Sequence, residues 1–202
     1  GRPGWHIECS AMARRYLGDS IDIHGGGQDL QFPHHECEVA QTEALTGKKF
    51  ANYWMHNGYI NINNEKMSKS LGNGILVKDL RKQYKWESIR YFMLSSQYRN
   101  PLNFNDETID QAEKSTERIR NAVDNIKHRL TAVMNDETVS INEGLQSRLT
   151  DILASYHAKM QDDFNTPDAI TAMFEWVNET NTLLQEPVVK ASDLHALLEA
   201  FN

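Results

Sequence analysis

The strongest constraint on the fold is a long, unbroken helical pattern in the second half of the sequence. Apolar residues and one threonine recur there at alternating spacings of three and four, which is the spacing of one face of an α-helix. This seam consists of Ile109, Ala112, Thr116, Ile119, Val123, Ile126, Leu130 and Val133. A helix of this length with a single apolar face packs against other helices, so the sequence predicts a helical bundle.

Three further helical patterns complete the predicted bundle. Thr166 and Ser192 are expected to cap the last two helices, with Pro167 in a first turn. The positions expected to face inward are Leu145, Leu149, Ile152, Tyr156 and Met160, then Ile170, Met173, Phe174 and Val177, then Leu194, Leu197, Leu198 and Phe201. This half shows helix packing and no residues arranged for chemistry.

The net charge of −7 divides unevenly along the chain. Residues 1–105 carry 13 Lys/Arg and 10 Asp/Glu, whereas residues 106–202 carry 8 and 18. The sign therefore changes near Asn105, which predicts two domains, 1–105 and 106–202. A protein that coats nucleic acid uniformly would not show this split, so any RNA contact must come from local basic spots or from elsewhere in the protein.

Several classes of protein are disfavoured by the sequence. No apolar run approaches the ~18 residues that a membrane helix needs. The first residues show no secretory signal, and the missing initiator Met suggests that the chain was cut or processed before Gly1. Two cysteines, Cys9 and Cys37, are too few for a disulfide scaffold and fit a metal or redox role in a cytosolic protein. We therefore expect a cytoplasmic protein with no membrane partner.

The first half alternates helical and strand patterns, which predicts an α/β fold. Pro33 suits the first turn of the second helix, and Tyr53, Trp54, Tyr59, Ile60 and Ile62 are core candidates. The expected elements are a helix over 5–16, a strand over 20–24, a helix over 34–45, one or two strands over 52–62, helices over 76–83 and 86–96, and an irregular linker over 100–105.

Two loops in this half suit phosphate or nucleotide binding. Gly25–Gly27 follows a strand and precedes Asp29, so the backbone could approach a ligand while the carboxylate accepts from a ribose or an amine. The run Lys66–Asn73 places two lysines three residues apart among serines, where they could stabilise charge on phosphates in a transition state. A tight turn and a basic surface loop are the plain alternatives.

A metal site is the third candidate. His34, Cys37 and Glu38 lie at i, i+3 and i+4, so all three can face one side of a helix, and Cys9 lies on an earlier helix. Thiolate, imidazole and carboxylate are all zinc ligands. A buried thiol, a hydrogen-bonded histidine and a surface glutamate remain the structural alternative.

Taken together, these motifs resemble one enzyme family. The string Lys-Met-Ser-Lys-Ser-Leu-Gly-Asn resembles the KMSKS loop of class I aminoacyl-tRNA synthetases. In order and approximate spacing, the whole set resembles cysteinyl-tRNA synthetase, and the resemblance covers nearly the whole chain. The segments that carry it are Trp5–Ser10, Asp22–Leu30, Phe32–Glu38, Trp54–Gly58, Glu65–Asn73 and Asp162–Pro167.

The resemblance implies a fold and an activity. It implies the C-terminal half of a Rossmann-like nucleotide-binding domain followed by an all-α bundle. The parent enzyme, expected to be a monomer, would use ATP with Mg²⁺ to convert L-cysteine to cysteinyl-adenylate and then transfer it to tRNA(Cys). The N-terminal half, with its HIGH motif and a fourth metal-ligating cysteine, and the anticodon-recognising part would lie outside this chain. The isolated chain is therefore expected to be inactive.

The resemblance also implies residue roles. One Zn²⁺, held by Cys9, His34 and Glu38, would bind the substrate thiolate and reject serine. The other implied roles are a cysteine pocket of Trp5, His6 and Asp29, ATP contacts from Gly25, Gly27, Asp29, Lys66, Ser68 and Lys69, and stabilisation of the pyrophosphate by Lys66 and Lys69. Cys37 replaces the family's usual Asn and is either a substitute ligand or incidental.

Three alternatives stay open at this point. A mycothiol-pathway cysteine ligase uses similar chemistry on an amino sugar. A non-catalytic zinc or RNA-binding module would need no catalytic residues. A structural protein built on the bundle would leave the first 75 residues unexplained.

Overall fold

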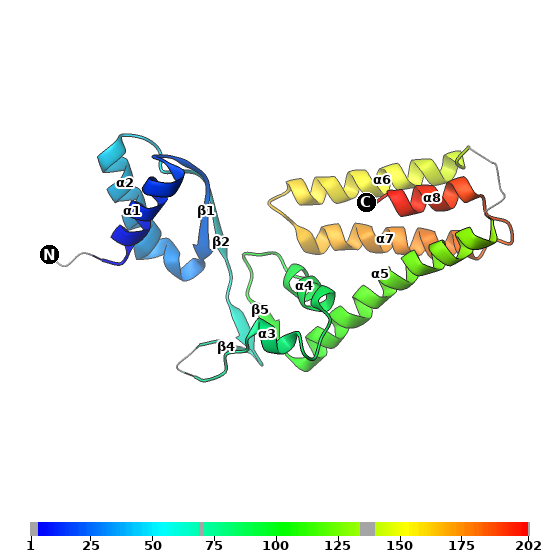
Figure 1. Cartoon of the computed structure of the whole chain (residues 1–202), viewed down its shortest axis with the longest axis horizontal. Helices are drawn as coiled ribbons and strands as arrows, with labels where there is room; N and C mark the ends of the chain where they lie inside the picture. The colour runs from blue at the N-terminus through cyan, green and yellow to red at the C-terminus, as the bar shows by residue number, and fades with distance from the viewer. Residues whose placement is uncertain (1–3, 69–70, 134–139, 202) are drawn as a thin grey trace. The chain divides into compact units, whose positions relative to one another are not determined.

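The computed structural model describes residues 4–68, 71–133 and 140–201, and these form two compact units (Figure 1). The first unit runs to Leu71 and takes in Tyr98–Asn103. The second contains Gly72–Gln97 and continues from Phe104. The chain enters the second unit for the last time at Phe104, beside the predicted boundary at residue 105. Residues 72–97, which were predicted to belong to the first domain, lie in the second unit. The division into domains 1–105 and 106–202 stays a prediction.

A βαβ arrangement forms the centre of the first unit. Its elements are α1 (His6–Leu17), β1 (Ile21–Gly27), α2 (Glu36–Thr46) and β2 (Ala51–Asn57). β1 and β2 pair in parallel, with Ile21 opposite Ala51 and Gly27 opposite Asn57. Parallel neighbours need a crossover, and α2 supplies it. Helices α1 and α2 lie side by side (Figure 1), and this alternation confirms the α/β class.

The connection from β1 to α2 is longer than the sequence indicates. It contains a 3₁₀ turn, η1 (Gln28–Leu30), and a kinked π-helical turn, η2 (Gln31–His35). Phe32 is extended inside η2, as expected for a residue that precedes proline. The prediction that the helix starts at His34 with Pro33 in its first turn is therefore wrong by two residues, since α2 begins at Glu36.

A small sheet belongs to the first unit except for its last residue, Phe104. It consists of β3 (Ile60–Ile62), β4 (Glu65–Lys66) and β5 (Leu102–Phe104), in the order β4-β3-β5. The predicted linker over 100–105 is therefore partly a strand, because the Leu102 amide donates to the Tyr59 carbonyl at 2.8 Å. At Gly58 this segment comes so close that a Cβ would meet the Arg99 carbonyl oxygen at 2.8 Å.

The apolar core of the first unit is small. Ile21, Phe50 and Ala51 are buried, and Ala13, Val39 and Trp54 pack against them. Tyr53 was a predicted core residue, but it is 70% exposed because the described elements leave that part of β2 uncovered.

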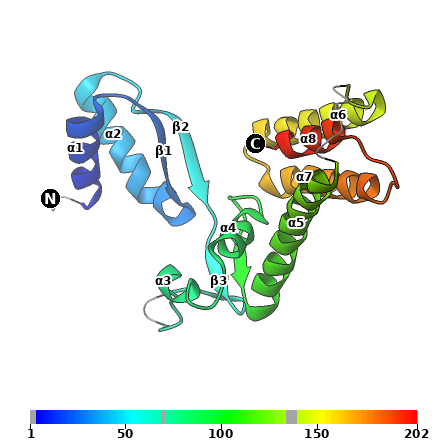
Figure 2. The same cartoon turned by 45° about the vertical axis from the view of Figure 1, so that its right-hand side comes forward.

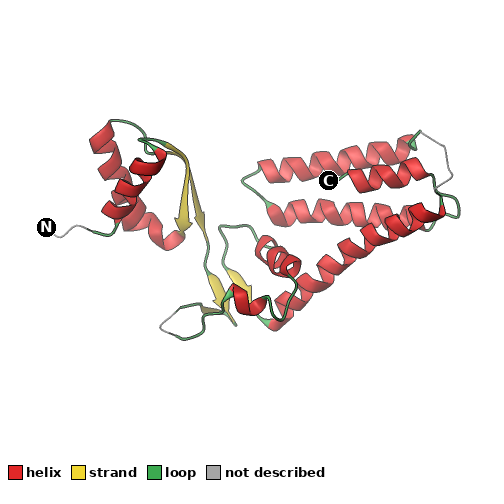
Figure 3. Cartoon of the chain, in the orientation of Figure 1, coloured by secondary structure: helices red, strands yellow, loops and turns green. Residues whose placement is uncertain are grey.

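The second unit is mainly helical (Figure 3). Its helices are α3 (Val77–Leu80), α4 (Trp86–Leu94), α5 (Asp106–Ala132), α6 (Glu143–Gln161), α7 (Thr166–Leu184) and α8 (Ala191–Glu199). α5, α6, α7 and α8 pack together as the predicted bundle (Figures 1 and 2). Their shared core contains Ala122, Ile126, Leu145, Leu149, Ile152, Ala172, Trp176, Val177, Val189, Leu194 and Leu197. Among the described residues, none of these helices has the length and apolar character needed to cross a membrane.

Two details of the bundle differ from expectation. On α7 the buried stripe includes Ala169, Ala172 and Trp176, whereas Ile170, Met173 and Phe174 are half-buried. The caps also differ, because Asn165 precedes α7 and accepts from the Asp168 amide at 3.3 Å, so Thr166 is the first helical residue. Ser192 lies inside α8 and donates to the Ser140 carbonyl instead of capping.

Candidate functional site

Cys9, His34 and Glu38 converge on one place. One ligand atom from each lies within 4.8 Å of the others. The three come from α1, η2 and the first turn of α2, and the packing of α1 against α2 brings Cys9 to the pair. Cys37 is not a member of this group. The structure thus places the three predicted ligands together, and their binding of zinc stays a prediction.

Glu38 is the most deeply buried member of the group. Its side chain is 1% exposed, with Oε2 2.8 Å from His24 Nε2 and Oε1 2.8 Å from His34 Nε2. Despite that short distance, Oε1 receives no aligned hydrogen bond from any residue that the structure describes. A buried carboxylate oxygen without a hydrogen bond destabilises the folded protein, and a cation shared with His34 and Cys9 would satisfy this oxygen. The residues present therefore fit a divalent metal ion.

The surroundings of Cys9 also favour a cation. Burial raises the pKa of the Cys9 thiol, and the charges of Glu38 and Glu8 raise it further. When only these carboxylates surround it, the Cys9 thiol keeps its proton. A bound divalent ion reverses this because it stabilises the thiolate directly.

A second group of imidazoles adjoins the first, and the sequence analysis did not assign it a role. His35 Nδ1 lies 2.8 Å from His56 Nε2, and His24, His35 and Glu38 also have ligand atoms within 4.8 Å of one another. Burial, followed by the neighbouring His24, His56 and His34, lowers the pKa of His35 to about 4. The available signal was that His24 and His56 stand near the ends of two predicted strands. These strands pair in parallel, with His24 opposite Trp54 and His56 opposite Gly26, two positions further along.

Trp5 and His6, the residues expected to line a cysteine pocket, lie beside this centre. The ring centroids of Trp5 and His6 are 4.4 Å and 6.1 Å from that of His34. Trp5 remains 62% exposed, so its indole forms an open wall and not part of the core.

A separate cavity of about 300 Å³ gathers part of the predicted nucleotide site. Its lining is Gly27, Asp29, Asn57, Gly58, Tyr59, Ile60, Lys66 and Met67. The Lys66 ammonium lies over the Tyr59 ring, 3.7 Å from its centroid. A Cβ at Gly27 would displace the Asp29 carboxylate from its present position. Gly25 and Ser68 are not in the lining, and Lys69 lies outside the described residues.

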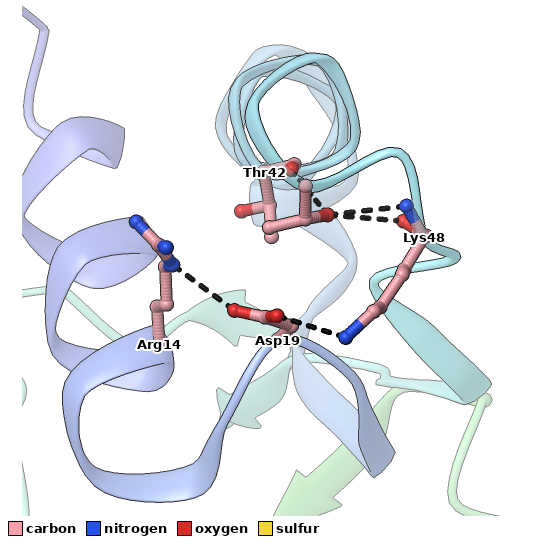
Figure 4. Close-up of polar contacts among 5 residues, drawn as sticks. Arg14, Asp19, Thr42 and Lys48 are labelled. Carbon is pink, nitrogen blue, oxygen red and sulfur yellow. Dashed lines mark hydrogen bonds and ion pairs between the residues drawn. The ribbon is translucent and has the colours of Figure 1, made fainter.

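Another hollow of the first unit, about 540 Å³, lies between α1 and α2, and none of the predicted site residues line it. Asp19 on its rim binds Arg14 at 3.0 Å and Lys48 at 2.9 Å (Figure 4). The hydrogen bonds from Lys48 and Arg14 lower the pKa of Asp19.

Known proteins resemble this chain along its whole length. A cysteine–tRNA ligase from Geobacillus thermodenitrificans is 56% identical over 203 residues, covering 100% of this chain and 43% of that protein. One from Bacillus cytotoxicus is 58% identical over 186 residues, covering 92% of this chain and 40% of that protein. The chain therefore spans less than half the length of these curated relatives.

Structural and family comparisons agree with the fold. A leucyl-tRNA synthetase (LeuRS) from Agrobacterium radiobacter K84, solved in a ternary complex with tRNA and LeuAMS, superimposes with a TM-score of 0.68 at 19% identity. That match covers 89% of this chain and 25% of the synthetase, and it shows the fold alone. Residues 155–202 match the DALR domain, and residues 1–114 match the catalytic domain of class I (C) tRNA synthetases. Because this second match takes in more than half of the chain, the chain belongs to the class I (C) tRNA synthetase family.

Proposed function

We propose that the chain forms part of a cysteine–tRNA ligase that selects its amino acid through a zinc ion held by Cys9, His34 and Glu38. The observation that supports this most is the convergence of three ligand atoms within 4.8 Å around the buried Glu38 Oε1, which no described residue satisfies with a hydrogen bond. The activity is proposed for a protein of the relatives' length that contains this chain, because the chain covers 43% of the first of them.

Zinc would supply the selectivity. In this chain three protein ligands leave a coordination position open for a substrate thiolate, and with the fourth cysteine expected outside this chain the zinc would become five-coordinate when the thiolate binds. A thiolate binds Zn²⁺ far better than the serine hydroxyl at neutral pH. A contact in an ordinary pocket discriminates similar side chains by only ~1–3 kcal/mol. Trp5 and His6, which stand next to His34, would enclose the remainder of the amino acid.

The 300 Å³ cavity would hold part of the ATP or adenylate. Asp29 would accept from a ribose hydroxyl or the substrate amine, while Gly25, Gly27 and Ser68 would flank the nucleotide. The cysteine carboxylate attacks the α-phosphate, forming one P–O bond as the bond to pyrophosphate breaks, so no general base is needed. Lys66 and Lys69, with Mg²⁺, would stabilise the charge that develops on the departing pyrophosphate.

The acceptor in the second step would be tRNA(Cys). The names of the relatives support tRNA over the amino sugar of a mycothiol-pathway ligase. Since residues 106–202 carry 8 Lys/Arg against 18 Asp/Glu, the RNA contacts would come from basic positions of the first unit or from beyond this chain. We infer that the enzyme acts in the cytoplasm, where its tRNA would be charged. We also expect it to be a monomer.

Cobalt spectroscopy tests the zinc assignment without requiring turnover. Co²⁺ replaces Zn²⁺ in such sites, and each bound thiolate adds a charge-transfer band in the near ultraviolet. We expect one such band from Cys9 in the 202-residue chain and an increase on adding L-cysteine but not L-serine. Cys9→Ser should lose the first band, while the control Cys37→Ser should keep it. A band that survives Cys9→Ser, or an equal response to both amino acids, would contradict the proposal.

The acceptor is tested separately. In a protein of the relatives' length, tRNA(Cys) should accept cysteine and the amino sugar should not. Transfer of cysteine to the amino sugar but not to tRNA(Cys) would favour the mycothiol-pathway alternative. The lysine roles are tested by the double variant Lys66→Ala, Lys69→Ala, whose activity would refute them.

A further inference from the structure

The two carboxylate oxygens of Glu38 have different surroundings. Oε1 faces the predicted metal ligands and lacks an aligned hydrogen bond from the described residues, whereas Oε2 lies 2.8 Å from His24 Nε2. An ionised carboxylate only accepts hydrogen bonds, so the proton in this second contact belongs to His24 Nε2. One oxygen is therefore already occupied and the other is left for a cation.

We propose that His24 is a positioning residue of the metal centre: its Nε2–H holds Glu38 Oε2, so that Oε1 stays turned toward Cys9 and His34. This inference rests on the proposed zinc site and extends it by one residue. Carboxylates that bind metals are commonly held by such outer hydrogen bonds, and losing one typically weakens metal binding by ~10–100-fold.

His24 is well placed for this task because it is fixed from several sides. Its ring lies 4.9 Å from Trp54, 5.4 Å from Phe50 and 4.7 Å from His35, measured between centroids. Phe50 is fully buried, and His24 itself is anchored in β1, opposite Trp54 of β2. The hydrogen bond thus ties a ligand on helix α2 to the strand pair, which fixes the carboxylate against rotation.

A second metal site is the competing explanation, since His24, His35 and Glu38 also satisfy ligand distances. The hydrogen bonds argue against it. A histidine nitrogen that donates a proton to Glu38 has no lone pair for a metal, and His35 Nδ1 is engaged with His56 Nε2 at 2.8 Å. A second ion would have to displace the His24 hydrogen bond from Glu38 or bind through the remaining ring nitrogens, so we infer that the imidazole group supports one ion.

Two amide substitutions separate these explanations. In His24→Gln the side-chain N–H takes the place of Nε2–H, whereas in His24→Asn it takes the place of Nδ1 and cannot reach Glu38. Zn²⁺ affinity of the 202-residue chain is measured by competition with a chromophoric chelator, with thermal unfolding of the metal-free chain as a measure of stability. His56→Asn is the matched control, because it alters the same imidazole group without touching Glu38.

We expect His24→Asn to bind Zn²⁺ ~10–100-fold more weakly than wild type, while His24→Gln and His56→Asn stay close to wild type. A purely structural role would instead lower the stability of both His24 variants without separating their zinc affinities. Equal zinc affinity in wild type and His24→Asn would overturn the positioning role and leave the zinc site standing. Two Zn²⁺ per wild-type chain would overturn it in favour of a second site, and no binding by wild type would overturn both inference and proposed function.

Discussion

The two units of this chain fill their interiors with different kinds of side chain. In the first unit the fully apolar core is small, and polar side chains are buried beside it: Ser10, His34, His35, Glu38 and Thr42. The bundle of the second unit has a continuous apolar core formed by α5, α6, α7 and α8. Part of the volume that would hold apolar side chains in the first unit is thus occupied by the candidate ligands His34 and Glu38.

The difference teaches where stability and function come from. Apolar burial stabilises the bundle directly, at ~25 cal/mol per Å² of surface removed from water. Buried polar groups stabilise the first unit only when each finds a partner, and Glu38 Oε1 still lacks one among the described residues. We therefore expect the second unit to be stable by itself and the first to gain stability from its ligand.

The largest expected effect comes from the bundle core. Leu194 is fully buried, so Leu194→Ala should destabilise the second unit by ~2–5 kcal/mol through lost burial and a cavity. Denaturant unfolding followed by hydrogen exchange in α6 and α7 measures this. Val188, which is 85% exposed, is the control, and Val188→Ala should change stability by less than ~0.5 kcal/mol. A large loss of zinc affinity in Leu194→Ala would break the distinction between the units.

Zinc should act on the first unit alone. At a free concentration ~100 times Kd, a ligand that binds only the folded state adds ~2.7 kcal/mol. Hydrogen exchange should slow in β1 and α2, which carry His24 and Glu38, and should stay unchanged in α6 and α7. Chelation should reverse the effect. Equal slowing in α2 and α6 would mean that the ion does not act at the predicted site.

A smaller effect is expected at the start of α5. Asn105 accepts from the Thr108 amide at 2.8 Å while Thr108 Oγ1 receives the Asn105 amide, which is a capping box. Asn105→Ala should cost the second unit ~1 kcal/mol, whereas Asn105→Ser keeps an acceptor and should cost much less. Denaturation midpoints of the two variants compare them directly, and equal midpoints would show that the cap contributes nothing.

The smallest effect belongs to Asp19. Lys48 and Arg14 hold its pKa below the usual 3.8 in the folded state, so the ionised form stabilises folding above that pH and the contribution disappears as pH falls through the lowered value. The carboxylate is exposed, so the gain is slight and screened by salt. Wild type should be marginally more stable than Asp19→Asn at neutral pH, and the two should converge in acid. A difference that grows in acid would contradict this.

The sequence predicts the bundle well because helix packing leaves a periodic pattern. Ile109, Ala112 and Ile126 are buried as the seam requires. The pattern fails on α7, where Ala169 and Ala172 are buried because small side chains let neighbouring helices approach closely. Apolar periodicity alone favours the larger Met173 and Phe174. In β5 the signal is absent, because pairing with Tyr59 joins segments distant in sequence.

The candidate site is predictable only in part. His34 and Glu38 can be paired from their spacing on one helix face, and Cys9 joins them only through the family resemblance. His24 leaves no such signal, since its partner Glu38 lies on another element and a single hydrogen bond has no period. The helix spacing that reveals one ligand pair therefore cannot reveal what holds it in place.

Zinc K-edge X-ray absorption on the zinc-loaded chain tests the central claim most directly. We expect one sulfur at ~2.3 Å with the remaining ligands nitrogen or oxygen, and a second sulfur when L-cysteine is added but not when L-serine is added. A coordination shell without sulfur, or one that L-cysteine leaves unchanged, would contradict the account.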